Sequence, residues 1–384
     1  MKRLDPRDVS FSRFAPRIWH GMTFGAWRTL IHGNLRHVTR DRIGVVASIT
    51  LLSMGSSLLR WVSDLAYSRQ LARVEITPDP VFILGYWRSG TTWLHQLVAS
   101  DSRFAAPSGL QVFMPETFLV GRWFIKPILS IWVPTKRPMD HVKLGSDTSE
   151  EDEVALAVSG APSVMRRVAF PARSVPDSSL TLSSLDQASQ ERWFAKWDAF
   201  LRKVQLVNPG KWILLKSPNH ATRIPEVLKR FPNAKFIHIS RDPYKIFQSL
   251  QHMRYAMAAT QGLSSVAVDP ESSRLDSYNE FQAYHDKFHN DLPLIPKSSI
   301  SFVRYEELRR DPIGEMARVY NELGIGGFEQ AEPALRARCE HVKNYVNMSY
   351  DLDPSLEEEI WTQAKAYFDH YGYVRMSERE QGAP

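Results

Sequence analysis

The feature that most constrains the fold is an apolar run followed by a glycine-bounded loop and a helical pattern, VFILGYWRSGTTWLHQL over residues 81–97. Residues 81–84 predict a buried strand, and the apolar spacing from Thr91 onward predicts a helix. A loop that leads from a strand into a helix directs several backbone N–H groups, and the positive end of the helix dipole, at one point. The sequence therefore predicts a binding site for a phosphate-like anion.

The loop has the spacing of a P-loop, with Gly85, four residues, Gly90 and then two threonines. Nucleotide triphosphatases place a lysine at the position of Thr91, and that lysine reaches the β- and γ-phosphates. Arg88, inside the loop, supplies a cation with two parallel donors instead. The loop is therefore suited to a phosphate-like group and poorly suited to ATP hydrolysis.

Two more apolar runs, at residues 212–215 and 235–240, predict further strands, and each is followed by a helical pattern. Asp242 and Pro243 begin the second of these helices, because Asp is a favoured N-cap and Pro a favoured first residue. Connections of this length between strands require a parallel sheet. With another strand at residues 300–304, the chain is predicted to form a P-loop-like, three-layer α/β domain around a central parallel sheet.

Residues 1–79 are predicted to be a basic helical segment that precedes the α/β domain, residues 80–384, with a Pro-Asp-Pro breaker between them. The first 80 residues hold twelve basic and six acidic residues, a balance that equals the +6 charge of the whole chain. Residues 43–59 carry no charge and are at the lower limit for a membrane span. A buried helix or a helix on a membrane surface is favoured over a span, so we expect either a solvated helical face or a peripheral membrane contact through residues 14–60.

The cysteine count, the N-terminal residues and the histidines bear on the cellular location and on whether the protein binds a metal. The single cysteine, Cys339, excludes an internal disulfide and a cysteine zinc site, which fits a reducing compartment. The N-terminal residues are charged throughout and lack a signal-peptide pattern, so we expect a cytoplasmic or membrane-associated protein. His285 and His289 share one helix face without a third ligand nearby in the sequence, and no metal site is expected.

Three motifs follow one another along the α/β domain: WRSGTT at residues 87–92, ISRDPYKIFQS at 239–249 and VRYEELRRDP at 303–312. In order they resemble the 5′-phosphosulfate loop, the 3′-phosphate motif and a later tyrosine–glutamate segment of sulfotransferases that use 3′-phosphoadenosine-5′-phosphosulfate (PAPS). The resemblance covers about residues 81–312 and is closest to the bacterial branch with a helical lead-in. It implies sulfuryl transfer from PAPS to a hydroxyl or amine, without a metal.

PAPS carries negative charge at its 5′-phosphosulfate and at its 3′-phosphate, so its binding requires two anion sites. The loop provides the first site, and Arg241, at the end of a strand, provides a cation for the second on the same edge of the sheet. The resemblance adds Ser249, two turns into the next helix, and Tyr305. The expected nucleotide-binding residues are Arg88, Ser89, Gly90, Thr91, Thr92, Arg241, Ser249 and Tyr305.

Sulfuryl transfer requires a cation at the leaving oxygen and a base at the acceptor. Lys216 is the candidate cation, because related sulfotransferases keep a lysine at this position, and Arg88 would share its role. For the base, Glu116 and His220 rank level, and the acidic run at residues 150–153 ranks slightly behind. Each candidate also has a purely structural interpretation. These are a helix cap for His220, a surface position for Glu116 and an interaction with the helix dipole for the acidic run.

Two other functions remain open, a P-loop kinase or ATPase and a non-catalytic binding protein. The Phe- and Trp-rich stretch 104–135 and the basic segment suggest an apolar or bulky acceptor, such as a lipid or glycolipid. No nucleic acid partner is expected, because the aromatic residues of the basic segment follow helical spacing. The sequence makes no prediction of the oligomeric state.

Overall fold

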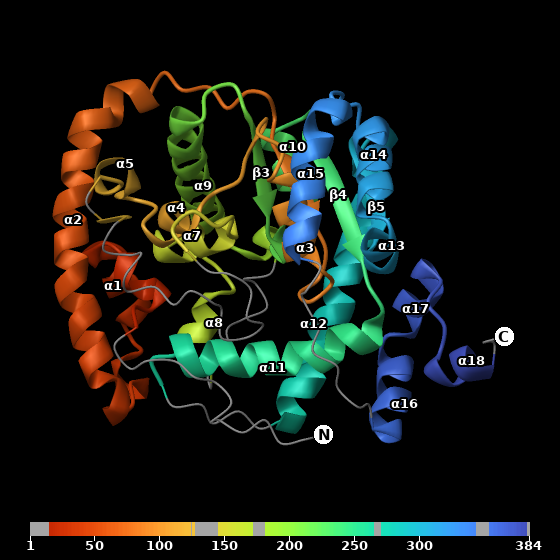
Figure 1. Ribbon diagram of the computed structural model, residues 1–384. Coiled ribbons are helices and arrows are strands. Elements are labelled where there is room, and N and C mark those ends of the chain that lie inside the picture. Colours follow the sequence, from red (N-terminus) through yellow and green to blue (C-terminus); the bar gives the residue numbers. More distant parts are fainter. Residues whose placement is uncertain are drawn as a thin grey trace.

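The computed structural model describes residues 15–123, 125–126, 145–171, 181–264, 270–342 and 353–381. Its centre is a sheet of five parallel strands in the order β2-β3-β1-β4-β5 (Figure 1), which confirms the predicted α/β fold. The strands are β1 Val81–Leu84, β2 Phe104–Ala105, β3 Trp212–Lys216, β4 Lys235–Ser240 and β5 Ile300–Arg304. The sequence did not predict β2, because two residues at the edge of a sheet carry no periodic signal.

The register of the sheet aligns the ends of its strands. In the centre, Ile83 of β1 pairs with Lys216 of β3 on one side and with Ile237 of β4 on the other. On β4, Ser240 pairs with Arg304 of β5. Because all strands are parallel, the residues that follow them leave the sheet at one carboxyl edge, which is where open α/β sheets bind ligands.

Both faces of the sheet are covered, which explains why its strands are continuous apolar runs. Phe82 and Leu84 of β1 belong to a buried cluster with α9 and α11, whereas Val81 and Ile83 belong to a cluster with α3, α14 and α15. The domain therefore has the predicted three layers. The helices that follow strands or extend the body are α3 Thr91–Val98, α9 Gln187–Val207, α10 Ile224–Arg230, α11 Pro243–Gln261, α12 Pro270–Asp291, α13 Tyr305–Arg310, α14 Pro312–Glu322, α15 Phe328–Val342, α16 Pro354–Gln363, α17 Lys365–Tyr371 and α18 Met376–Gln381.

The N-terminal segment is helical and shares a core with the α/β body. Trp19, Trp27 and Ile49 lie in the same buried cluster as Phe82 of β1. The predicted helical segment begins with short pieces, and a long helix, α2, then runs along one side of the molecule (Figure 1). The elements are η2 Ile18–Gly21, α1 Phe24–Ile31, η3 Leu35–His37, η4 Arg40–Arg42 and α2 Ile43–Leu71. The stretch Arg40–Leu71 is long and apolar enough to cross a membrane, by length and composition only.

Short helices connect β2 to α9. They are α4 Gly109–Phe113, α5 Phe118–Gly121, α7 Asp152–Val158, α8 Arg166–Ala169 and η6 Leu182–Ser184. The part of the Phe- and Trp-rich stretch 104–135 that follows residue 126 lies outside the described residues. The predicted acidic helix start is present in α7, but every residue of α7 is buried, including Asp152 and Glu153.

Candidate active site

The loop between β1 and α3 has a backbone that only glycine tolerates at two points. Gly85 has φ 153°, and a Cβ atom there would lie 2.8 Å from the carbonyl oxygen of Ile239. Gly90, the N-cap of α3, has φ 101°, and a Cβ atom there would lie 2.3 Å from the ring of Tyr305. Arg88 has φ 68° and is the one non-glycine residue with positive φ among the described residues. Such strain is concentrated at functional sites.

The structure brings the two predicted anion-binding groups into direct contact. The Arg88 Nε donates to Ser249 Oγ at 3.3 Å, and an Arg241 guanidinium nitrogen donates to the carbonyl oxygen of Arg88 at 2.9 Å. The Arg241 guanidinium also stacks on the Tyr305 ring, 4.2 Å from its centroid. Four residues that lie far apart in sequence therefore meet at the carboxyl edge of β1, β4 and β5.

This group of residues has the properties of an anion site. Among the described residues, no carboxylate lies within ion-pair distance of Arg241. Burial and the Arg88 charge lower the pKa of its guanidinium by more than the charges of Tyr305, Glu306 and Asp242 raise it. The Ser89 hydroxyl is buried and has no hydrogen-bond partner there. Thr91 and Thr92 begin α3, whose first N–H groups have no acceptors within the helix. A phosphate or phosphosulfate group would complete these unsatisfied donors, so the residues fit the predicted donor.

Lys216 ends β3 at the same edge of the sheet. Its side chain is buried, with 1% exposed, and its Nζ donates to the Glu151 carboxylate at 2.5 Å. Glu151 is the N-cap residue of α7 and is 20% exposed, so it is the accessible member of this pair. The pair places a cation beside a carboxylate, which are the two kinds of group that sulfuryl transfer requires.

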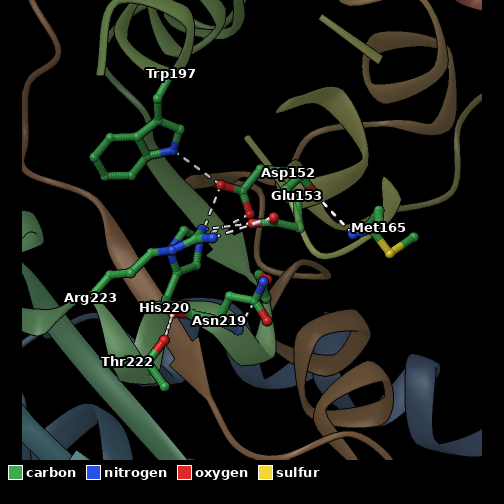
Figure 2. A network of polar contacts seen from close by, with 10 residues as sticks. Asp152, Glu153, Met165, Trp197, Asn219, His220, Thr222 and Arg223 are labelled. Atoms are coloured by element: carbon green, nitrogen blue, oxygen red, sulfur yellow. Dashed lines mark hydrogen bonds and ion pairs between the residues drawn. The ribbon is translucent and has the colours of Figure 1, made fainter. Parts of the chain in front are cut away.

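The next two acids of the run are fully buried and hold the segment after β3, where the 3₁₀ helix η7 Pro218–Thr222 begins. Asp152 lies 3.0 Å from His220 Nε2, and Glu153 accepts from Arg223 at 2.7 Å. Figure 2 shows both carboxylates pointing toward these partners, with the indole of Trp197 bonded to Asp152 at 3.1 Å. Each of three consecutive acids, from Glu151 onward, thus pairs with a different residue of the segment that begins at Lys216.

His220, a base candidate from the sequence, is enclosed by this network. Its ring has no exposed surface and packs against Phe82 and Trp197, with centroids 5.0 and 5.9 Å away. Burial alone would raise the pKa of Asp152, but the His220 charge and the hydrogen bonds from His220 and Trp197 lower it. The geometry favours a structural ion pair and does not support His220 as the group that receives the acceptor proton.

Glu116, the other leading candidate for the base, is already paired with two lysines. Its two carboxylate oxygens each accept from a lysine of α9, Lys196 and Lys203, at 2.8 Å. Burial alone would raise the pKa of Glu116, but the charges of Lys203 and Lys196 outweigh it and bring the pKa to about 2. A carboxylate held this firmly in its ionised form is a weak base, so the structure does not support Glu116 in that role.

Glu151, which the sequence ranked only within the acidic run, is the carboxylate that contacts Lys216. The structure also reveals Asn219, whose amide is buried next to His220 and has no hydrogen-bond partner among the described residues. His285 packs against the rings of Phe281 and Tyr367, with centroids 4.4 and 4.5 Å away. In the described part of the chain, no group of three or more His, Cys, Asp or Glu side chains could hold a metal ion.

A parallel α/β sheet with a P-loop-like anion site and a lysine–carboxylate pair at its carboxyl edge is the arrangement of a group-transfer enzyme. Residues 80–330 match the model of the Sulfotransferase family, and this chain belongs to that family. It is 32% identical over 97% of its length to the omega-hydroxy-beta-dihydromenaquinone-9 sulfotransferase Stf3 of Mycobacterium bovis and of Mycobacterium tuberculosis, and covers 95% of each.

Solved structures agree on the fold. Sulfotransferase STF9 of Mycobacterium avium is similar over 94% of this chain and 98% of its own, with TM-score 0.64 and 18% identity. Sulfotransferase STF1 of Mycobacterium tuberculosis is similar over 88% and 90%, with TM-score 0.62 and 18% identity. The chain is therefore a transferase enzyme that moves sulfuryl groups, and the kinase or ATPase alternative receives no support.

Proposed function

We propose that this enzyme transfers the sulfuryl group of PAPS to a hydroxyl of a lipid-like acceptor by in-line displacement. PAPS is the usual donor in the family. The name of the mycobacterial relative, which matches along nearly the whole chain, supports a hydroxylated isoprenoid quinol or a similar lipid as the acceptor. The observation that carries the proposal is the contact of Arg88, Ser249 and Arg241 beside the glycine-bounded loop.

The donor would be held at its two charged ends. The N–H groups of the loop and of the first turn of α3, with Arg88, Ser89, Thr91 and Thr92, suit the 5′-phosphosulfate, because a helix N-terminus and a guanidinium both favour an anion. Arg241 and Ser249 suit the 3′-phosphate. Tyr305, which lies between Gly90 and Arg241, would keep that guanidinium in position.

When bound, PAPS supplies an activated sulfuryl group. The acceptor oxygen forms a bond to sulfur while the bond from sulfur to the phosphate oxygen breaks, and the phosphate keeps the electron pair. Lys216 and Arg88 would stabilise the charge that develops on that oxygen. Glu151 would receive the hydroxyl proton, because it is the carboxylate in contact with Lys216 that retains exposed surface. Asp152 and Glu153 would fix Glu151 through the start of α7.

The test is a transfer assay with radiolabelled PAPS and two isoprenoid quinols, one with a terminal hydroxyl and one without. We expect label only in the hydroxylated lipid, and thermal stabilisation of the protein by 3′-phosphoadenosine 5′-phosphate (PAP) without Mg²⁺. Stabilisation by ATP and Mg²⁺ with none by PAP would contradict the proposed donor. Label transferred to water-soluble phenols but to no lipid would contradict the proposed acceptor class.

We further propose a cytoplasmic location at a membrane surface. A single cysteine, partly buried on α15, fits a reducing compartment. A lipid acceptor would place the enzyme next to a bilayer. Fractionation of cells into soluble, peripheral and integral membrane proteins tests this, and recovery in the integral fraction after a high-pH wash would contradict it.

A further inference from the structure

Helix α2 is inverted relative to an ordinary helix of a water-soluble protein. Its buried residues are Ile49 and three serines, Ser53, Ser56 and Ser63. Val45, Val46, Tyr67 and Leu71 pack against the core, but most of its other large apolar residues lie on the outside, with exposed fractions between 53% and 72%. They are Ile43, Leu51, Leu52, Met54, Leu58, Trp61 and Leu65. An amphipathic helix in water normally turns the opposite face to solvent, so this outer face is shaped for an apolar environment.

The polar side of α2 is used for contacts with the protein. Thr50 accepts from the indole of Trp27 at 2.9 Å, and Ser57 accepts from the backbone N–H of Phe24 at 2.8 Å. Arg42 donates to a carbonyl oxygen of α11, and Arg60 lies near Glu116. These bonds hold the serine and threonine side of the helix against α1 and the body, and thereby fix the apolar side outward.

The outer apolar residues form a continuous row. Leu51, Met54, Leu58, Trp61 and Leu65 follow one another at intervals of three and four residues, which places them on one stripe of the helix. From residue 43 to 65 the only charged residues are Arg60 and Asp64, and these two pair with each other. In the described part of the chain α2 lies at one side of the molecule, with no element beyond it (Figure 1).

The charges at the two ends of α2 identify the partner. Arg36 and Arg40 are exposed before the helix and Arg69 and Arg73 at its end, and each end also carries one exposed acid, Asp41 or Glu75, so both ends stay positive. A second copy of the chain, packed on this row in either direction, would bring arginines against arginines. An anionic bilayer surface is complementary to both ends, and it accepts the apolar row without requiring a matching register.

We propose that the outer face of α2, defined by the row from Leu51 to Leu65 with its terminal arginines, docks the enzyme on an anionic lipid bilayer. The helix lies in the interface and does not span it, because its other face is bonded to the protein. This inference rests on the proposed function only for the statement that the acceptor is a lipid.

The experiment is flotation of the full chain with vesicles of phosphatidylcholine, with and without phosphatidylglycerol. The variant L58Q/L65Q removes two leucines of the row, and L294Q/V374Q removes two exposed apolar residues elsewhere as a matched control. We expect the wild type and the control to float with anionic vesicles. We expect L58Q/L65Q to bind them about 100-fold more weakly, since one leucine contributes about tenfold to partitioning.

Equal flotation of L58Q/L65Q and wild type overturns the proposal, as does a wild type that binds neither kind of vesicle. A wild-type dimer in light scattering that L58Q/L65Q dissociates overturns it in favour of a second copy. Activity separates docking from chemistry. L58Q/L65Q is expected to keep wild-type transfer to a short, water-soluble acceptor and to lose transfer to vesicle-embedded lipid. If the wild type sulfates neither acceptor, the proposed function fails while the flotation result still decides the docking.

Discussion

The sharpest prediction concerns the three consecutive acids at the start of α7, because each has a different partner. Replacing Glu151 with Gln keeps an oxygen that accepts from Lys216 and changes a side chain that is 20% exposed. Because Lys216 is itself buried and keeps a neutral acceptor in place of a carboxylate, the cost in stability is about 1–3 kcal/mol. Its cost in turnover is large, since loss of a general base lowers the rate by about 10²–10⁴-fold, or about 3–5 kcal/mol of transition-state free energy.

The neighbouring variants should behave in the opposite way. Asp152 has no exposed surface and holds both His220 and Trp197, and Glu153 holds the buried Arg223. Glu153→Gln leaves the buried Arg223 cation without its carboxylate, which costs about 3–5 kcal/mol of folding free energy. Asp152→Asn weakens the buried hydrogen bonds to His220 and Trp197, which costs about 1–3 kcal/mol. We expect both variants to unfold earlier in urea and yet to keep turnover within about tenfold per folded molecule.

The assay combines three measurements on each variant: urea unfolding, PAP affinity by calorimetry, and initial rates with radiolabelled PAPS. E151Q should lose turnover with unchanged PAP affinity and a smaller loss of stability than E153Q. If E151Q retains more than about a tenth of wild-type turnover, Glu151 is not the base. If D152N loses turnover without losing stability, the His220 and Asp152 pair is the proton acceptor, and our interpretation of the network is wrong.

Three further predictions concern the loop, the second anion site and Glu116. Gly90→Ala should weaken PAP binding, because its Cβ would displace the Tyr305 ring, whereas Gly324→Ala, with φ 58° and open space, should cost only about 1–2 kcal/mol of stability. Arg241→Met should raise the PAP dissociation constant by about 10- to 100-fold, since a hydrogen bond to a charged group is worth about 1.5–3 kcal/mol, and an unchanged calorimetric affinity would contradict this. Glu116→Gln should lower the free energy of unfolding at pH 7 by about 3 kcal/mol, because the pKa of Glu116 falls from its ordinary 4.5 to about 2 on folding. A group with a depressed pKa stabilises fully above its unfolded value, so the difference in urea midpoint between wild type and E116Q should persist above pH 4.5 and shrink toward pH 2.

The strands and the contact between Arg88 and Arg241 could be predicted because their signals are local. An uninterrupted apolar run gives β1, the Asp242 and Pro243 pair gives the start of α11, and parallel topology then requires Arg88 and Arg241 to leave the sheet at one edge. The contact between these two arginines therefore follows from a few short motifs.

The choice of base could not be predicted, because it depends on which acids are already occupied. Glu116 pairs with two lysines on a helix far along the chain, and Asp152 pairs with His220. The local sequence around either acid does not predict these partners. Glu151 differs from its neighbours only by its position at the helix cap. The orientation of α2 could not be predicted either, because the uncharged stretch 43–59 does not indicate which of its sides faces the protein. The contacts of Thr50 and Ser57 with α1 show this only in the structure.

The triple attachment of α7 to the end of β3 has a consequence for how such enzymes diversify. Because Glu151, Asp152 and Glu153 all pair with one short segment, the proposed proton acceptor Glu151 and the cation Lys216 are held at a defined separation. New acceptor preferences can then arise by replacing the stretches that surround the attachment of α7 to β3, while the attachment itself stays the same. Chimeras that exchange those stretches between relatives should change which alcohol is chosen while the speed of the chemical step is conserved.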